Sequence, residues 1–110
     1  MIKWFFEQTP IFEKNFNKLV PIDIQEGFKK QISKLLSENP YSGKPLGYKF
    51  FREKKIKKWR IYYLIYDQYL VLYFINVSDK KLQQSTIDKI KSELNLLKEY
   101  IESKYKGKFN

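Results

Sequence analysis

Hydrophobic residues change their spacing twice along this chain of 110 residues. Up to about residue 40 they recur every three or four positions, which is the period of a helix, and between residues 48 and 77 they alternate with polar residues, which is the period of a strand. Beyond Ser85 the helical period returns. The pattern predicts a single α+β domain over residues 1–110, with an N-terminal strand, an αα-hairpin, an antiparallel three-stranded meander and a long C-terminal helix.

The N-terminal part predicts a strand and then a helix. Ile2–Glu7 is a short apolar run that is typical of a strand. Thr9 precedes Pro10, and a threonine cap followed by proline in the first turn is typical of a helix start. We expect this helix to end at Pro21, because proline cannot continue the helical hydrogen bonds.

A second helix is predicted to begin at Asp23 and to end at Asn39. Asp23 and Glu26 match an Asp version of the capping box. Asn39 precedes Pro40, and a residue in that position disfavours helical geometry. Residues 41–47 should then form an irregular connection to the meander.

The meander is predicted as three strands, over Tyr48–Glu53, Trp59–Tyr66 and Tyr69–Val77, with Asp67 and Gln68 as a tight hairpin turn. Residues 78–81 should leave the sheet.

A final helix is predicted to start at Ser85 with Asp88. Its apolar residues form a narrow stripe with seven-residue spacing, namely Ile87, Ile90, Leu94, Leu97 and Ile101. Such a stripe favours packing on the sheet, although it could also face a partner. We expect residues 105–110 to fray.

Arg60 lies inside the predicted central strand, where a charged side chain costs stability unless its surroundings are polar. Side chains alternate across a strand, so Arg60 shares one face with Tyr62 and Tyr66, opposite the face that meets the helices. This predicts a partly open groove with Arg60 beside two tyrosines. A purely structural alternative is that Arg60 stacks on a ring or pairs with Glu53.

The composition narrows the chemistry. The chain has no Cys and no His, which excludes thiolate nucleophiles, disulfides and every catalytic triad built on imidazole. Catalysis therefore falls to Lys, Arg, Tyr, Asp or Glu. The net charge of +10, from 22 Lys and Arg against 12 Asp and Glu, favours a polyanionic partner, although a Lys-rich surface also serves solubility.

Basic residues are densest just before the central strand. Between residues 44 and 60 they are Lys44, Lys49, Arg52, Lys54, Lys55, Lys57, Lys58 and Arg60, against the single acid Glu53. The run Lys54–Lys58 is predicted as a loop or hairpin tip, flanked by aromatic strands. Cations that hold phosphates, next to rings that stack unpaired bases, are typical of proteins that bind single-stranded RNA.

At this point the chain resembles the RelE/ParE superfamily of toxins from bacterial and archaeal toxin–antitoxin pairs. The most specific parts are Trp59-Arg60-Ile61-Tyr62-Tyr63, which is similar to the family's aromatic-Arg-aliphatic-x-Tyr strand, and Asn76–Lys81, where the family has a small basic cluster. The helix from Thr9 to Leu19, the connector Gly43-Lys44-Pro45-Leu46 and the strand ending at Phe51-Arg52 extend the resemblance over most of the chain.

The resemblance to RelE-like members implies an mRNA endoribonuclease, commonly acting in the ribosomal decoding site without metal or cofactor. The ribose 2′-hydroxyl would attack the adjacent phosphate and leave a 2′,3′-cyclic phosphate and a 5′-hydroxyl. Arg60 matches the family's strand arginine and is assigned to stabilising the transition-state charge, with Lys80 and Tyr62 completing the catalytic set. The residues assigned to RNA binding are Arg52, Lys49, Lys54, Lys55, Lys57, Lys58 and Lys81.

Two features depart from the family pattern. RelE-type sites usually carry a Tyr or His several residues beyond the basic cluster, where this chain has Ser85-Thr86-Ile87, and Tyr48 and Phe50 replace the lysines of the first meander strand. The role of the missing Tyr or His could then fall to Tyr62, to Tyr66 or to a lysine with a lowered pKa. Two alternatives therefore stay open: a ParE-like toxin that inhibits DNA gyrase, and a catalytically inactive RNA-binding or protein-interaction module of the same fold.

The resemblance also implies an antitoxin partner, commonly encoded by the adjacent gene, whose acidic or amphipathic segment would cover the basic toxin. Messenger RNA and the ribosome are the other expected partners.

No hydrophobic run approaches the ~20 residues of a membrane span, and the N-terminal residues lack the features of a signal peptide. We therefore expect no membrane partner and a cytoplasmic location.

Overall fold

The computed structural model describes residues 3–108. The elements, in chain order, are β1 (Phe5–Gln8), α1 (Pro10–Leu19), α2 (Ile22–Ser37), the short 3-10 helix η1 (Pro40–Ser42), β2 (Lys44–Pro45), β3 (Phe51–Ile56), β4 (Trp59–Tyr66), β5 (Val71–Asp79), α3 (Gln83–Ser92), α4 (Leu94–Tyr105) and the 3-10 helix η2 (Lys106–Lys108). The predicted α+β class is confirmed.

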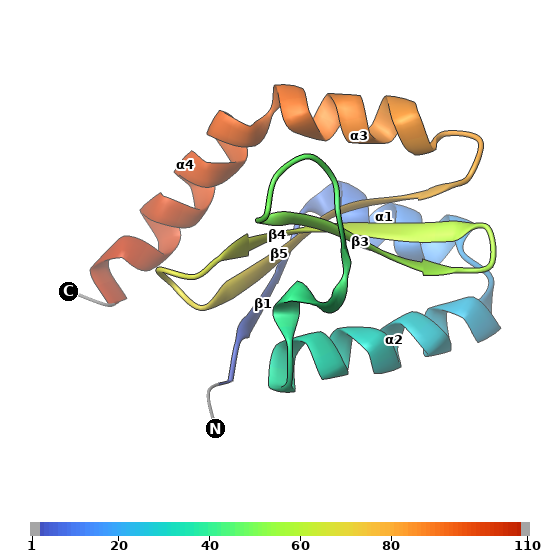
Figure 1. Cartoon of the computed structure of the whole chain (residues 1–110), viewed down its shortest axis with the longest axis horizontal. Helices are drawn as coiled ribbons and strands as arrows, with labels where there is room; N and C mark the ends of the chain where they lie inside the picture. Colours follow the sequence, from blue (N-terminus) through green and yellow to red (C-terminus); the bar gives the residue numbers. More distant parts are fainter. Residues whose placement is uncertain (1–2, 109–110) are drawn as a thin grey trace.

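The strands form one five-stranded sheet in the order β1-β5-β4-β3-β2. β1 runs parallel to β5, and the other neighbours are antiparallel. The helices cover both faces, so that α2 and α3 lie on opposite sides of the sheet (Figure 1). The first core, between the sheet and helices α1 and α2, contains Phe12, Phe16, Phe28, Tyr63 and Phe74 among its buried residues. The second, under α3 and α4, contains Phe51, Tyr62, Ile87, Ile90 and Ile101.

The start of α1 and the bounds of β4 agree with the sequence pattern. Thr9 is the N-cap of α1, and its Oγ1 accepts a hydrogen bond of 3.0 Å from the Phe12 backbone N–H. The same hydroxyl donates to the Ile75 carbonyl at 2.7 Å. One buried side chain therefore both caps the helix and ties it to β5.

The predicted start of the second helix differs slightly. α2 begins at Ile22 with Pro21 at the N-cap position, and no side chain makes a capping hydrogen bond there. Asp23 lies in the first turn, where a carboxylate favours the positive end of the helix dipole.

The first two strands of the sheet edge differ from the prediction. The predicted strand Tyr48–Glu53 begins only at Phe51 and continues to Ile56. The basic run was predicted as a hairpin tip, but Lys54 and Lys55 lie in β3, and only residues 57–58 form the turn, with Lys57 at a φ of 54°. The two-residue strand β2 was not predicted, because two residues are too few to show a period.

The third predicted strand is also shifted. β5 begins at Val71 after a four-residue turn, rather than at Tyr69 after a two-residue one, and it continues to Asp79 instead of ending at Val77. An irregularity in register opposite Tyr62 and Tyr63 marks a bulge in this ladder. A bulge adds one residue to a strand, which alternation of residue types does not reveal.

The predicted single C-terminal helix is two helices that meet at Glu93 and bend around the sheet face (Figure 1). Fraying from residue 105 is wrong for Tyr105, which is 6% exposed, belongs to α4 and donates a hydrogen bond to Glu7. Lys104 Nζ also lies 2.6 Å from Glu7 Oε2. These contacts tie the end of α4 to β1; residues 109–110 of the predicted frayed segment lie outside the described residues.

Candidate functional site

A hollow of about 450 Å³ opens between the end of the β3–β4 hairpin, the edge strand β2 and the first residue of α3. We call it the Arg60 hollow; it is lined by Ser42, Gly43, Lys44, Glu53, Lys54, Lys55, Arg60 and Gln83. Strand register explains the grouping. Lys55 pairs with Arg60 and Glu53 pairs with Tyr62 across β3 and β4, and paired residues point to the same face.

Arg60 lines this hollow but is not in an open groove, since it is only 5% exposed. Its Nη1 donates a 3.0 Å hydrogen bond to the Lys58 carbonyl. Its Nε lies 4.0 Å from Glu53 Oε2, and no hydrogen-bond partner for Nε exists within the described part of the chain. The predicted open groove is therefore wrong in its exposure, and the predicted ion pair with Glu53 is present as a long contact. A buried guanidinium N–H without a partner is a donor that an oxyanion can satisfy.

Glu53 is the acidic residue of this hollow and is also only 5% exposed. Gln83, at the start of α3, donates from Nε2 to its two carboxylate oxygens at 3.2 and 3.4 Å. From the sequence, Glu53 was predicted only as a possible counter-ion of Arg60. Glu53 and Arg60 point to the same face of the sheet from adjacent strands. The sequence could reveal this only if the position of the hairpin turn were known, because the turn sets the register of the two strands.

Tyr62 is fully buried, so the expectation that it lines an open groove is wrong. Its hydroxyl lies 2.7 Å from Ser78 Oγ. Burial is the main cause that raises the pKa of Tyr62, and the hydrogen bond with Ser78 opposes it. A neutral phenol held in this way positions its strand, and its catalytic assignment stays a prediction.

The predicted RNA-binding residues separate into groups. Lys54 and Lys55 line the Arg60 hollow, while Lys57 and Lys58 lie at the hairpin turn, where Lys58 Nζ is 5.5 Å from the centre of the Trp59 ring. Lys80 and Lys81 are exposed in the turn that follows β5. Ser78 pairs with Arg60, which places this turn at the same end of the sheet as the hollow.

Arg52 and Lys49 lie elsewhere. Arg52 donates to the carbonyls of Lys49, Tyr41 and Gly43 at 2.8–2.9 Å. Its guanidinium is 5.2 Å from the centre of the Tyr41 ring, and Lys49 Nζ is 5.3 Å from the same ring. Arg52 therefore holds the connector that carries β2, because its hydrogen bonds go to that backbone.

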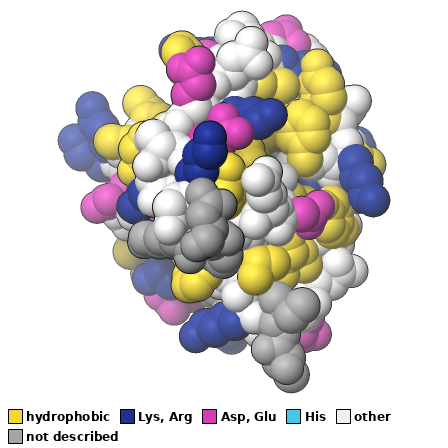
Figure 2. Space-filling view, turned by 90° about the vertical axis from the view of Figure 1, so that its left-hand side faces the viewer, with side chains coloured by type: hydrophobic (Ala, Val, Ile, Leu, Met, Phe, Trp, Pro, Cys, Tyr) yellow, Lys and Arg dark blue, Asp and Glu magenta, His cyan; other side chains and the backbone are white. Residues whose placement is uncertain are grey.

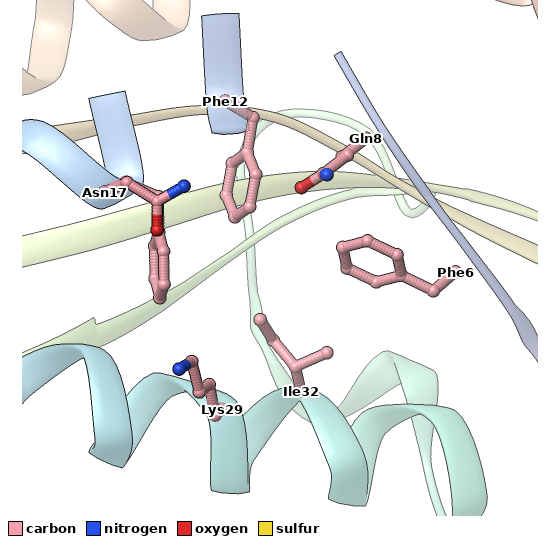
Figure 3. A pocket seen from close by; sticks show the side chains of 7 residues that line it. Phe6, Gln8, Phe12, Asn17, Lys29 and Ile32 are labelled. Carbon is pink, nitrogen blue, oxygen red and sulfur yellow. The ribbon is translucent and has the colours of Figure 1, made fainter. Parts of the chain in front are cut away.

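A second hollow, of about 270 Å³, lies between β1, α1 and α2 (Figure 3). Phe6, Phe12 and Ile32 point into it, and Lys29 and Asn17 lie along one side. Its walls are mainly apolar, so it does not resemble the cationic Arg60 hollow.

Within residues 3–108 no group of acidic residues is placed to hold a metal ion, and no helix is long and apolar enough to cross a membrane.

Comparison with solved structures gives clear matches. The free E. coli toxin RelE, as a mutant, superposes with a TM-score of 0.66 at 20% identity, covering 79% of this chain and 92% of that chain. The chain has the RelE toxin fold. The RelE toxin of the intact E. coli RelBE toxin–antitoxin complex matches with a TM-score of 0.62 at 21% identity, over 69% of this chain and 95% of that chain. The RelBE2 complex of Mycobacterium tuberculosis matches with a TM-score of 0.59 at 20% identity, over 72% of this chain and 93% of that chain.

No protein-family model matches the chain, and the comparison with curated proteins finds no match. The RelE fold is therefore recognised through structure, and the resemblance based on the strand Trp59–Tyr63 is confirmed at that level. The RelE structures are covered almost completely, whereas part of this chain extends beyond each match.

Proposed function

We propose that this chain is the toxin of a toxin–antitoxin pair and that it cleaves RNA at the Arg60 hollow. The RelE fold supports the toxin assignment. The main observation in support of RNA cleavage is the environment of Arg60. Its buried Nε has no hydrogen-bond partner among the described residues, and three lysines line the same hollow. A phosphate would satisfy this N–H and replace Glu53 as the neighbour of the guanidinium.

The reaction would proceed by attack of the ribose 2′-hydroxyl on the adjacent phosphorus. The new bond joins the 2′-oxygen to phosphorus, the bond to the 5′-oxygen breaks, and the products are a 2′,3′-cyclic phosphate and a 5′-hydroxyl. One group must take the 2′-proton and another must protonate the leaving oxygen. Cations must also stabilise the charge that develops on the non-bridging oxygens.

We assign the proton acceptor to Glu53 and the charge stabilisation to Arg60. Glu53 is the carboxylate that lines the hollow, and it lies 4.0 Å from the guanidinium. Lys80 is proposed as the group near the leaving oxygen, because its turn follows the strand that pairs with Arg60. Lys54, Lys55, Lys57, Lys58 and Lys81 would hold the RNA backbone. Tyr62 and Arg52 would contribute indirectly, because Tyr62 positions its strand and Arg52 positions the connector that carries β2.

The proposed partners follow from charge and fold. Solved RelE relatives form complexes with RelB antitoxins, and a chain with a net charge of +10 suits an acidic antitoxin segment. Messenger RNA on the ribosome, in the cytoplasm, remains the proposed target.

The proposal is tested by induced expression in a bacterial host, with growth, protein synthesis and primer extension on cellular messages as readouts. We expect the wild type to arrest growth and to leave new 5′ ends, and Arg60→Ala and Glu53→Gln to abolish both effects. Lys30→Ala, which removes an exposed lysine on α2, is the matched control and should stay toxic. Circular dichroism must show that each variant is folded, and Arg60→Lys replaces Arg60→Ala if the latter is not.

Intact messages with wild-type protein would overturn the nuclease proposal. The burial of Arg60 and Tyr62 favours one second candidate, a ParE-like toxin that binds DNA gyrase and needs no exposed catalytic group. Loss of supercoiling with uncut messages would support that candidate. Growth without any arrest would support an inactive binding module.

A further inference from the structure

A third hollow, of about 260 Å³, lies at the other end of β4. We call it the Phe50 hollow. Its walls include Phe50, which ends the β2–β3 loop, Tyr66 from the end of β4, Asp67 and Gln68 from the β4–β5 turn, and Lys98 from α4. The volume is below the ~300–1,000 Å³ of pockets for drug-sized ligands. It therefore suits one planar ring system rather than a larger ligand.

Aromatic rings form one side of this hollow and continue outside it. Phe50 is 37% exposed, and the neighbouring ring of Tyr48 is 44% exposed. Their centres are 5.0 Å apart at a tilt of 32°. Two touching rings on a surface loop form an exposed apolar platform on which a further ring can stack. Figure 2 looks at the molecule from the end where the β4–β5 turn lies, and hydrophobic side chains reach the surface there beside Lys and Arg side chains.

Cations lie next to these rings. Lys91 Nζ is 5.9 Å from the centre of the Tyr48 ring. Lys98 lines the hollow itself. A platform that only packed against an apolar protein partner would gain nothing from these two ammonium groups, whereas a nucleic acid brings a phosphate with each base.

Polar groups complete the hollow. Asp67 Oδ2 accepts a hydrogen bond of 2.5 Å from the Tyr41 hydroxyl, which fixes this carboxylate at the turn. Asp67 and the neighbouring Gln68 supply acceptors and an amide donor at the rim. Such groups, placed beside aromatic walls, match the hydrogen-bonding edge of a nucleobase.

We infer that the Phe50 hollow binds one unpaired base of single-stranded RNA, stacked on Phe50, while another part of the same strand lies at the Arg60 hollow. Arg60 and Tyr66 lie six residues apart on β4, a separation of ~20 Å at ~3.3 Å per residue. A few nucleotides of extended RNA span this distance. The inference rests on the proposed RNA-directed function and adds to it a base-binding subsite away from the scissile phosphate.

The test measures binding of the full chain to short 2′-O-methyl oligoribonucleotides, which cannot be cleaved because the attacking hydroxyl is blocked. One probe carries bases throughout, and a second has the same length but lacks bases. We compare the wild type, Phe50→Leu and Phe6→Leu by fluorescence anisotropy. Phe6 is the matched control, because its ring is similarly exposed, at 40%, and lies on β1 at the opposite edge of the sheet.

We expect Phe50→Leu to weaken binding of the base-carrying probe by roughly tenfold or more, and to leave binding of the base-free probe unchanged. Phe6→Leu should bind both probes like the wild type. Equal affinity of Phe50→Leu and the wild type for the base-carrying probe would overturn the inference. The same holds if Phe50→Leu weakens only antitoxin binding, because the surface would then belong to a protein partner.

The two proposals fail in different ways. If the wild type binds the probes but Phe50→Leu has no effect, only the base-binding subsite is lost, and cleavage through Arg60 can still be observed. If the wild type binds neither probe at low salt, the RNA-directed function and the subsite both fail.

Discussion

At the scale of single residues, the proposed RNA cleavage depends on the buried pair of Arg60 and Glu53. Both side chains are 5% exposed, and their closest charged atoms are 4.0 Å apart. Burying two charges costs several kcal/mol per ion unless good hydrogen bonds compensate, and here Arg60 Nε lacks one among the described residues. The proposed function therefore requires the Arg60 guanidinium to exchange its carboxylate neighbour for a phosphate of the RNA.

Glu53→Gln tests this exchange. The substitution keeps the shape and removes the charge that competes with phosphate, so we expect binding of an uncleavable RNA to tighten several-fold. Cleavage should fall by about 100-fold or more, because general acid–base groups contribute ~10²–10⁴. Asp88→Asn, which removes the charge of an exposed acid on α3, is the control for net charge. Retained cleavage in Glu53→Gln would exclude Glu53 as the proton acceptor.

At the scale of elements, the edge strand β2 shapes the hollow. β2 pairs with Arg52 and Glu53 of β3, and Gly43 just before it is packed tightly. A Cβ at Gly43 would lie 2.5 Å from the Tyr63 hydroxyl and 2.8 Å from the Glu53 carbonyl oxygen. Only glycine allows the connector to approach β3 this closely.

Gly43→Ala should therefore destabilise the fold by about 1–3 kcal/mol, which is typical of overpacking, and should weaken RNA binding by moving Lys44. Urea unfolding measures the first effect and anisotropy the second. Gly107→Ala is the matched control, because a Cβ at that position meets nothing within 4 Å. An unchanged urea midpoint for Gly43→Ala would show that the connector adjusts without cost.

At the scale of the whole molecule, both cores contain buried tyrosines, among them Tyr63 in the first core and Tyr73 in the second. Burial raises the pKa of Tyr63 to about 12 and that of Tyr73 to about 12. In the unfolded chain both would ionise near ~10. The folded state therefore holds these protons more tightly, so their contribution to stability is complete below pH ~10 and is lost as pH rises towards 12.

Urea unfolding at a series of pH values checks this. The free energy of unfolding should be nearly flat up to pH ~10 and should then fall steeply, together with a late rise in tyrosinate absorbance. Tyr63→Phe should lower stability by about 1 kcal/mol at neutral pH, because the hydroxyl donates to the Pro40 carbonyl at 2.7 Å. It should also make the alkaline fall shallower. A free energy that stays flat to pH 12 would contradict the assignment.

Residue periodicity and the order of a few specific side chains were sufficient for the fold class. Thr9-Pro10 and the alternation in Trp59–Tyr66 are local signals, because capping and strand pleating depend on neighbours in sequence. They predicted α1, β4 and, with the basic cluster, the resemblance to RelE. The break at Glu93 and the bulge opposite Tyr62 have no such local signal, and both are decided by how the elements pack.

The chemistry of the hollow was decided by tertiary structure. That Arg60 is a cation in a strand follows from the sequence alone. Its burial, the approach of Glu53 from the neighbouring strand and the cover by Gln83 depend on the strand register and the packing of α3. The residues that bury and contact Arg60 are distant from it in sequence. Their contacts form only when the sheet and the helices pack together, so the sequence pattern alone does not show them.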